Sequence, residues 1–159
     1  MIKYLTFSFA ISVISWIVGM VVNAGLIKTP FYKQYLTKLN FITNEDLNRY
    51  IGIGTFKWII IHSLFKYFNP KLSLKKKIMA SELPDLRKEM TIAEISHLIG
   101  FIFVIGFVFV KVGQGYYLFA LVMLIVNILM NLYPTLLQQQ NKRRIDKYFK
   151  LLTIRGQSK

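Results

Sequence analysis

The chain has 159 residues, which is enough for one compact unit and too few for two ordinary domains. Hydrophobic residues make up 54% of it and gather in long blocks, which excludes an ordinary soluble domain. The chain has no cysteine, so disulfides and thiolate chemistry are excluded, and its net charge of +14 calls for an explanation.

The first apolar block runs from residue 4 to residue 27 and contains no charged residue. At about 1.5 Å per residue it exceeds the ~30 Å of hydrocarbon in a bilayer, so it predicts a transmembrane helix. The alternative is a secretory signal peptide, because Lys3 precedes the block and small residues precede Gly25. A cleaved signal would export the basic segment that follows, so the helix is the favoured interpretation.

Two further apolar blocks, residues 91–110 and 116–137, are separated by the turn KVGQG and predict an antiparallel pair of transmembrane helices. Of the 21 Lys and Arg residues, 12 lie in residues 28–88 and seven in residues 142–159. Cytoplasmic loops collect positive charge. We therefore expect a multi-pass protein of the cell membrane, with its N-terminus outside and a basic cytoplasmic tail, residues 138–159. Because topology explains the charge, nucleic-acid binding is not expected.

Residues 28–90 are too many for a simple connector. Around Trp58, aromatic residues alternate with lysines, and the apolar core is too short to span, so we expect an interfacial or re-entrant helix. The basic cluster Lys75–Lys77 that follows is expected to attract anionic lipid, or alternatively to seat the phosphates of a thioester donor. The predicted fold is a single all-α integral membrane domain, with three transmembrane helices and amphipathic interfacial helices in the cytoplasmic segment.

Polar residues at the start of the second block suggest chemistry. Glu94 and His97 are three residues apart and share a helix face, and Glu89 lies nearer the predicted cytoplasmic boundary. Ionisable groups inside a span usually face a bundle interior or a watery cavity and are functional. The alternative is a packing role. Glu-x-x-His is also the spacing of di-iron bundles, but those need two such pairs and this chain has one, so no metal is predicted.

The third block carries its own polar stripe. Pro134 is expected to kink this helix and to free a backbone carbonyl. Asparagines here can act as interhelical glue, but together with Glu94 and His97 they favour a polar pocket. The residues of the stripe are Asn127, Asn131, Gln138 and Asn141.

Two motifs follow one another along the chain. They read Glu89-x-x-x-Ala93-Glu94-x-x-His97 and, after one hairpin, Asn131-x-Tyr133-Pro134-x-x-x-Gln138-x-x-Asn141-Lys142-x-Arg144, with Arg155-Gly156 at the end. In this order they resemble the motifs of the glycosyl-4,4′-diaponeurosporenoate acyltransferase family. The resemblance covers roughly residues 35–156. It implies a small membrane enzyme that esterifies a sugar hydroxyl of a glycosylated carotenoid with a fatty acyl chain. Where the family usually has an arginine between Glu89 and Ala93, and a tyrosine and an arginine near Lys142, this chain departs from it, so another glycolipid or an aminolipid is a possible acceptor.

The residues fit acyl transfer. Histidine is the usual base for a hydroxyl that attacks an ester or thioester, so His97 is the expected base, with Glu94, or Glu89 in its place, holding the imidazole. No serine or cysteine lies in a nucleophile motif, so we expect direct transfer from an acyl-CoA or acyl carrier protein co-substrate, without a cofactor. The expected substrate-binding residues are Asn131, Tyr133, Gln138, Asn141, Lys142, Arg144 and Trp58. Of these, Lys142 and Arg144, together with Arg143, are expected to hold the phosphate of the donor.

The competing hypothesis is a non-catalytic membrane subunit whose polar residues only fasten helices together. Three spans leave few internal neighbours to cover the helix faces, so a homo-oligomer or a membrane partner is expected under either hypothesis.

Overall fold

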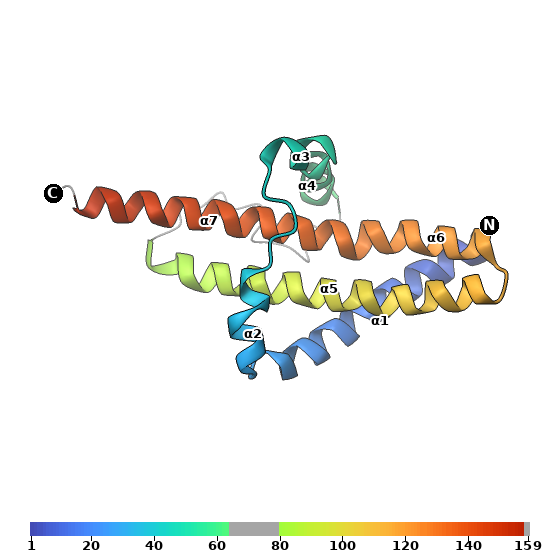
Figure 1. Ribbon diagram of the computed structural model, residues 1–159. Coiled ribbons are helices and arrows are strands. Elements are labelled where there is room, and N and C mark those ends of the chain that lie inside the picture. Colours follow the sequence, from blue (N-terminus) through green and yellow to red (C-terminus); the bar gives the residue numbers. More distant parts are fainter. Residues whose placement is uncertain (64–79, 158–159) are drawn as a thin grey trace.

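The computed structural model describes residues 1–63 and 80–157, and these residues fold into helices with no strand (Figure 1). Three of the helices are long and apolar enough to cross a membrane: α1 (Ile2–Leu26), α5 (Leu83–Gly113) and the stretch Tyr117–Leu152. That stretch comprises α6 (Tyr117–Asn127), the π-helical segment η5 (Ile128–Leu132) and most of α7 (Tyr133–Gln157). The predicted all-α fold with three membrane-crossing helices is confirmed.

Helices α5 and α7 extend beyond the apolar blocks from which they were predicted. α5 begins eight residues before the predicted span, and α7 carries residues 138–157, predicted as a tail, in the same helix as the third span. These polar extensions lie against each other, because Leu83 and Leu86 of α5 pack with Ile145 of α7. Apolar side chains on one face of each extension therefore prolong the two helices past the membrane-crossing blocks.

The predicted hairpin between the second and third spans is present, and α1 joins it at the turn. Gly115 makes the turn with a φ of +78°, which favours glycine. Lys111 lies over the rings of Tyr116 and Phe119, 5.7 and 5.3 Å from their centroids. Tyr4 stacks on Phe119 with centroids 4.5 Å apart. The N-terminus and the Lys111 turn thus lie at one end of the bundle and the C-terminus at the other (Figure 1).

Helix α1 packs on α5 through a stripe of small and polar residues. At Gly19 the two backbones are so close that an added Cβ would lie 2.1 Å from the carbonyl oxygen of Ser96. One turn later, Asn23 donates from Nδ2 to Ile92 O at 2.9 Å and to Ser96 Oγ at 3.0 Å. Such stripes let helices approach closely where both have apolar surroundings. The buried stripe consists of Ser8, Ser12, Ser15, Gly19 and Asn23.

The segment between α1 and α5 includes, among its described residues, the short helices α2 (Pro30–Gln34), η1 (Leu36–Lys38), α3 (Glu45–Tyr50) and α4 (Ile53–His62). Its far end leads into α5 through η4 (Ala80–Glu82). Thr29 caps α2, since its hydroxyl accepts a hydrogen bond from the Tyr32 N–H at 3.2 Å.

Helix α4 rests on the outer side of α7 (Figure 1). Ile53 is fully buried against Leu136 and Leu137, and the hydroxyl of Tyr133 donates to Ile51 O at 2.8 Å. Helix α4 has ten residues, fewer than the about 20 that a helix needs to span a bilayer. The remainder of the predicted aromatic segment and the cluster Lys75–Lys77 lie outside the described residues.

Gly19→Ala is expected to separate α1 from α5, because its Cβ would collide with backbone rather than with a flexible side chain. The cost should be about 1–3 kcal/mol. We expect a lower thermal unfolding midpoint for the protein purified in neutral detergent. Gly25→Ala, in the same helix but with nothing within 4 Å of the added Cβ, is the matched control and should leave the midpoint unchanged or slightly raised. Equal midpoints for the two variants would refute this helix contact.

Candidate functional site in the polar interior of the bundle

Polar residues fix the register between α5 and α7, which run antiparallel. Arg87 donates to Asp146 from Nε to Oδ1 at 2.6 Å and from Nη2 to Oδ2 at 3.2 Å, near the surface. Two turns along α5, in the interior, Gln139 donates from Nε2 to Glu94 Oε1 at 2.8 Å. The two pairs together align the polar face of α7 with that of α5.

Glu94 is at the centre of the interior cluster. Its side chain is 0% exposed, and besides Gln139 it has an ion pair with Lys142, which is 4% exposed. Lys142 also donates from Nζ to the carbonyl oxygens of Thr37 and Leu39, each at 3.4 Å. A buried charge is tolerated only when it is paired and hydrogen-bonded, and both charges here meet that condition.

The partners of Glu94 also hold the segment that crosses over them. Gln139 accepts a hydrogen bond at its Oε1 from the backbone N–H of Phe41 at 2.8 Å, while its Nε2 faces Glu94. Together with the hydrogen bonds from Lys142 to the carbonyls of Thr37 and Leu39, this contact satisfies backbone groups at the end of η1 and in the residues that follow it. The buried carboxylate therefore organises three pieces of chain: α5, α7 and this segment.

His97 lies one turn beyond Glu94, next to α1 and η5. The ring of Trp16 meets it edge to face, with centroids 5.9 Å apart. The imidazole is partly buried and interacts with the side chain of Asn131, but its Nδ1 has no hydrogen-bond partner. The sequence-based hypothesis that Glu94 holds His97 is corrected here, because Gln139 and Lys142 occupy the carboxylate of Glu94.

Asn131 and Asn127 connect the third span to the other two. Asn131 donates from Nδ2 to Ser15 Oγ at 3.1 Å and to Asn127 Oδ1 at 2.8 Å. Asn127 donates to Phe101 O at 3.0 Å. Both hydrogens of the Asn131 amide are therefore used, while its Oδ1 has no partner.

Pro134 frees a carbonyl, as the sequence predicts. Proline has no N–H, so it cannot donate to the carbonyl of Met130 four residues earlier. Trp16 donates instead, from Nε1 to Met130 O at 3.2 Å. The preceding residues take up the π-helical segment η5, a form that often occurs as a local bulge in an α-helix.

The remaining predicted site residues lie at different depths. Gln138 and Asn141 are buried on α7, and Gln138 Oε1 and Asn141 Nδ2 have no hydrogen-bond partner. Arg144 and Glu89 are exposed. Glu89 lies five residues before Glu94, about 140° around the helix, and so faces another side.

Trp58 is 61% exposed on α4, where it stacks on His62 with centroids 4.6 Å apart. Tyr133, by contrast, faces α4 and is bound to it by the hydrogen bond to Ile51 described above. The structure thus brings Glu94 and Lys142 into direct contact, and His97 next to Asn131. It leaves Glu89, Arg144 and Trp58 on the surface.

Two buried polar residues that contact Glu94 were not predicted from the sequence: Gln139 and Thr135. A signal for them was present, because polar residues recur every three or four positions along one face of the third span. Thr135 donates to Asn131 O at 2.9 Å, and its Oγ1 lies 3.5 Å from Glu94 O. The buried face consists of Asn127, Asn131, Thr135, Gln139 and Lys142.

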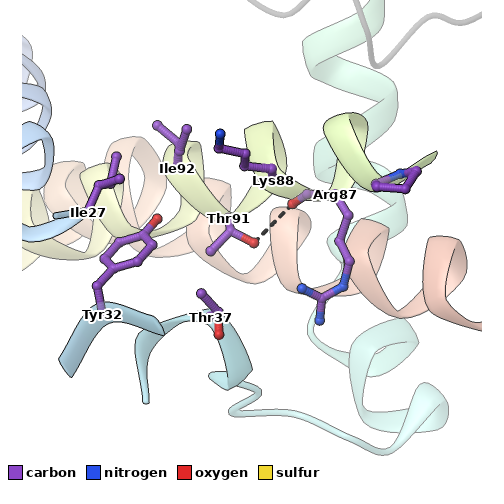
Figure 2. Close-up of a pocket in the computed structure, with 8 residues that line it drawn as sticks. Ile27, Tyr32, Thr37, Arg87, Lys88, Thr91 and Ile92 are labelled. Atoms are coloured by element: carbon purple, nitrogen blue, oxygen red, sulfur yellow. Dashed lines mark hydrogen bonds between the residues drawn. The ribbon is translucent and has the colours of Figure 1, made fainter. Parts of the chain in front are cut away.

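A pocket of about 220 Å³ opens beside the cluster, between the end of α1, the α2–η1 segment and the start of α5 (Figure 2). In Figure 2 the hydroxyl of Tyr32 points towards Thr91 and Ile92. The guanidinium of Arg87 extends from α5 towards the side of the pocket where Thr37 lies. Burial raises the pKa of Tyr32, and the negative charge of the neighbouring Glu94 raises this pKa further. The remaining lining residues are Ile27, Pro84 and Lys88.

Within residues 1–63 and 80–157, no group of three or more His, Cys, Asp or Glu side chains is arranged to hold a metal ion. The groups in this part of the chain that can bind a ligand or move a proton include the imidazole of His97, the amide atoms of the third span that have no hydrogen-bond partner, and the cations near the pocket.

The fold and the interior define a helical multi-pass membrane protein with a buried cluster of ionisable and amide side chains. The family model described as glycosyl-4,4′-diaponeurosporenoate acyltransferase matches residues 28–151, so the chain belongs to this family. It is thereby an acyltransferase of the carotenoid-pathway type. No match to the chain is found among curated proteins or among solved structures.

Replacement of Glu94 by Gln is expected to destabilise the protein strongly, since it leaves the buried ammonium of Lys142 without a counter-charge. The loss should be about 3–5 kcal/mol, a decrease of roughly 10 °C or more in the unfolding midpoint. The double variant Glu94→Gln/Lys142→Met, which removes both charges, should recover most of the lost stability.

The matched control is Asp146→Asn, which breaks the exposed pair with Arg87 and should cost at most about 1 kcal/mol. If Glu94→Gln were as mild as Asp146→Asn, or if the double variant were no better than the single one, the ion pair would not have the structural role assigned to it.

Proposed function

We propose that this protein is a membrane-bound enzyme that transfers a fatty acyl chain from an activated donor to a hydroxyl of a glycosylated lipid. The observation that carries the proposal is the position of His97, an imidazole with a free ring nitrogen within the polar interior of an acyltransferase-family fold. The acceptor is proposed to be a glycosyl carotenoid from the description of the family, and another glycolipid remains the second choice.

In the proposed reaction His97 is the general base. The acceptor hydroxyl donates its proton to the imidazole while its oxygen attacks the acyl carbonyl. The carbon–sulfur or carbon–oxygen bond to the donor then breaks, and the imidazolium returns the proton to the leaving thiolate or alkoxide. Histidine suits this exchange because its ordinary pKa is near neutral.

Asn131 is proposed to orient the base in place of Glu94. The amide hydrogens of Asn131 are used by Ser15 and Asn127, so its free Oδ1 can only accept, and an N–H of His97 is the neighbouring donor. Such a bond would select one tautomer and leave the other ring nitrogen available as a base. Glu94 then has a structural role, as the anchor of Gln139 and Lys142.

Gln138 and Asn141 are proposed to bind hydroxyls of the sugar. Both are buried and lie three residues apart on one face of α7, each with an unpartnered amide atom. An unpartnered buried polar atom costs about 1–3 kcal/mol, which a ligand hydroxyl would return on binding.

The proposed orientation has the N-terminus outside and the C-terminus in the cytoplasm. It is supported by the placement of the N-terminus and the Lys111 turn at one end of the bundle, with the basic α7 extension at the other. Thioester donors are made in the cytoplasm, so they would approach the pocket end of the bundle.

His97→Ala is expected to reduce acyl transfer by about 10²–10⁴-fold, the usual contribution of a general base. The assay is mass spectrometry of membranes that contain the protein and added glycosyl-4,4′-diaponeurosporenoate, in which the acceptor gains one fatty acyl mass. His62→Ala is the matched control, because this histidine is exposed on α4. Undiminished transfer by His97→Ala at equal protein level would eliminate His97 as the base.

A further inference from the structure

We propose that the pocket between α1, η1 and α5 binds a phosphate group of the acyl donor, with the adjoining alkyl part of the donor against the apolar wall. The inference rests on the proposed function and names a place for the donor that the interior cluster does not provide. Lys142, which the sequence favours for this task, is buried in its ion pair with Glu94 and has no free charge to offer.

The cations of the pocket can bind an anion. Lys88 lies on the rim and is exposed, and it has no ion pair with any described residue. Arg87 uses Nε and Nη2 for Asp146, which leaves Nη1 available for a further acceptor. Consecutive residues of a helix point about 100° apart, so the guanidinium and the ammonium would contact a phosphate from different sides. Each contact would be a charge-assisted hydrogen bond, which is the strong kind.

A second observation points to a ligand independently of charge. Tyr32 is only 5% exposed, and its hydroxyl points into the pocket (Figure 2). The hydroxyl interacts with the side chain of Asn23 but has no hydrogen bond of standard geometry. Leaving such a hydroxyl unpaired is costly, and a phosphate oxygen is an acceptor that would pair it. A phenol at its ordinary pKa, about 10, is protonated at neutral pH, and burial raises the pKa of Tyr32 further, so the hydroxyl can donate.

The walls and the size of the pocket specify an amphiphile. Ile27, Ile92 and Pro84 are the apolar residues that line the pocket, alongside the cations. A volume of about 220 Å³ is smaller than the ~300–1,000 Å³ of sites that enclose a whole drug-sized ligand. The pocket therefore fits a phosphate and a short alkyl portion, with the rest of the donor outside it. A pantetheine thioester and a phospholipid share this chemistry.

The test is binding to the full-length protein in neutral detergent, measured by calorimetry with coenzyme A as one probe. In a second arm the protein is placed in nanodiscs, and native mass spectrometry measures bound phosphatidylglycerol. We expect Lys88→Gln to weaken binding of one probe about 10-fold and Tyr32→Phe about 3-fold or more. The probe whose binding these substitutions weaken identifies the chemical class of the donor.

Two neighbouring surface residues give matched controls. Lys33→Gln and Tyr35→Phe remove the same groups from exposed positions outside the pocket and should change binding less than 2-fold. If neither probe responded to Lys88→Gln, or if Lys33→Gln had the same effect, the pocket would not be a phosphate site. His97→Ala should retain probe binding, so loss of transfer with intact binding separates the catalytic proposal from this one.

Discussion

The structure depends on the buried ion pair between Glu94 and Lys142. A carboxylate with 0% exposure and an ammonium with 4% exposure would each be costly alone, and together they are tolerated only with further hydrogen bonds. Gln139 supplies one of these bonds, and the carbonyls of Thr37 and Leu39 complete the shell of Lys142. Removing one charge would therefore affect two helices and the crossing segment at once.

Directional bonds of this kind suit a bundle whose outer faces are apolar. Two apolar helices in lipid gain little from burying more apolar surface, so close backbone approach and interhelical hydrogen bonds select the arrangement. Gly19 of α1 allows the close backbone approach. Asn23 and Asn127 make the interhelical hydrogen bonds, because each donates to a carbonyl of α5. The carbonyl of Met130, freed by Pro134, extends the same principle to α1 through Trp16.

How much the sequence could predict varies with the physical cause. The three long helices follow from apolar length alone, and Pro134 predicts a freed carbonyl because the missing N–H is a covalent fact. The partner of Glu94 was not predictable in this way. His97 is its neighbour at helical spacing, but the carboxylate is bound by Gln139 and Lys142 on another helix, and only the register of α5 with α7 decides this.

The pocket was also beyond prediction, because Tyr32 and Arg87 are far apart in the chain and nothing in the pattern of α2 signals a buried phenol.

The same ion pair makes a phosphate site next to a buried carboxylate physically reasonable. Glu94 is close enough to Tyr32 to raise its pKa, so an uncompensated charge at Glu94 would also repel an anion in the pocket. Lys142 neutralises that charge and at the same time donates to the carbonyl of Thr37, a residue that lines the pocket. The positive charge of Lys88 then remains uncancelled at the rim. Lys142, without contacting the substrate, thus both helps to shape the wall of the pocket and keeps the net charge of the pocket positive.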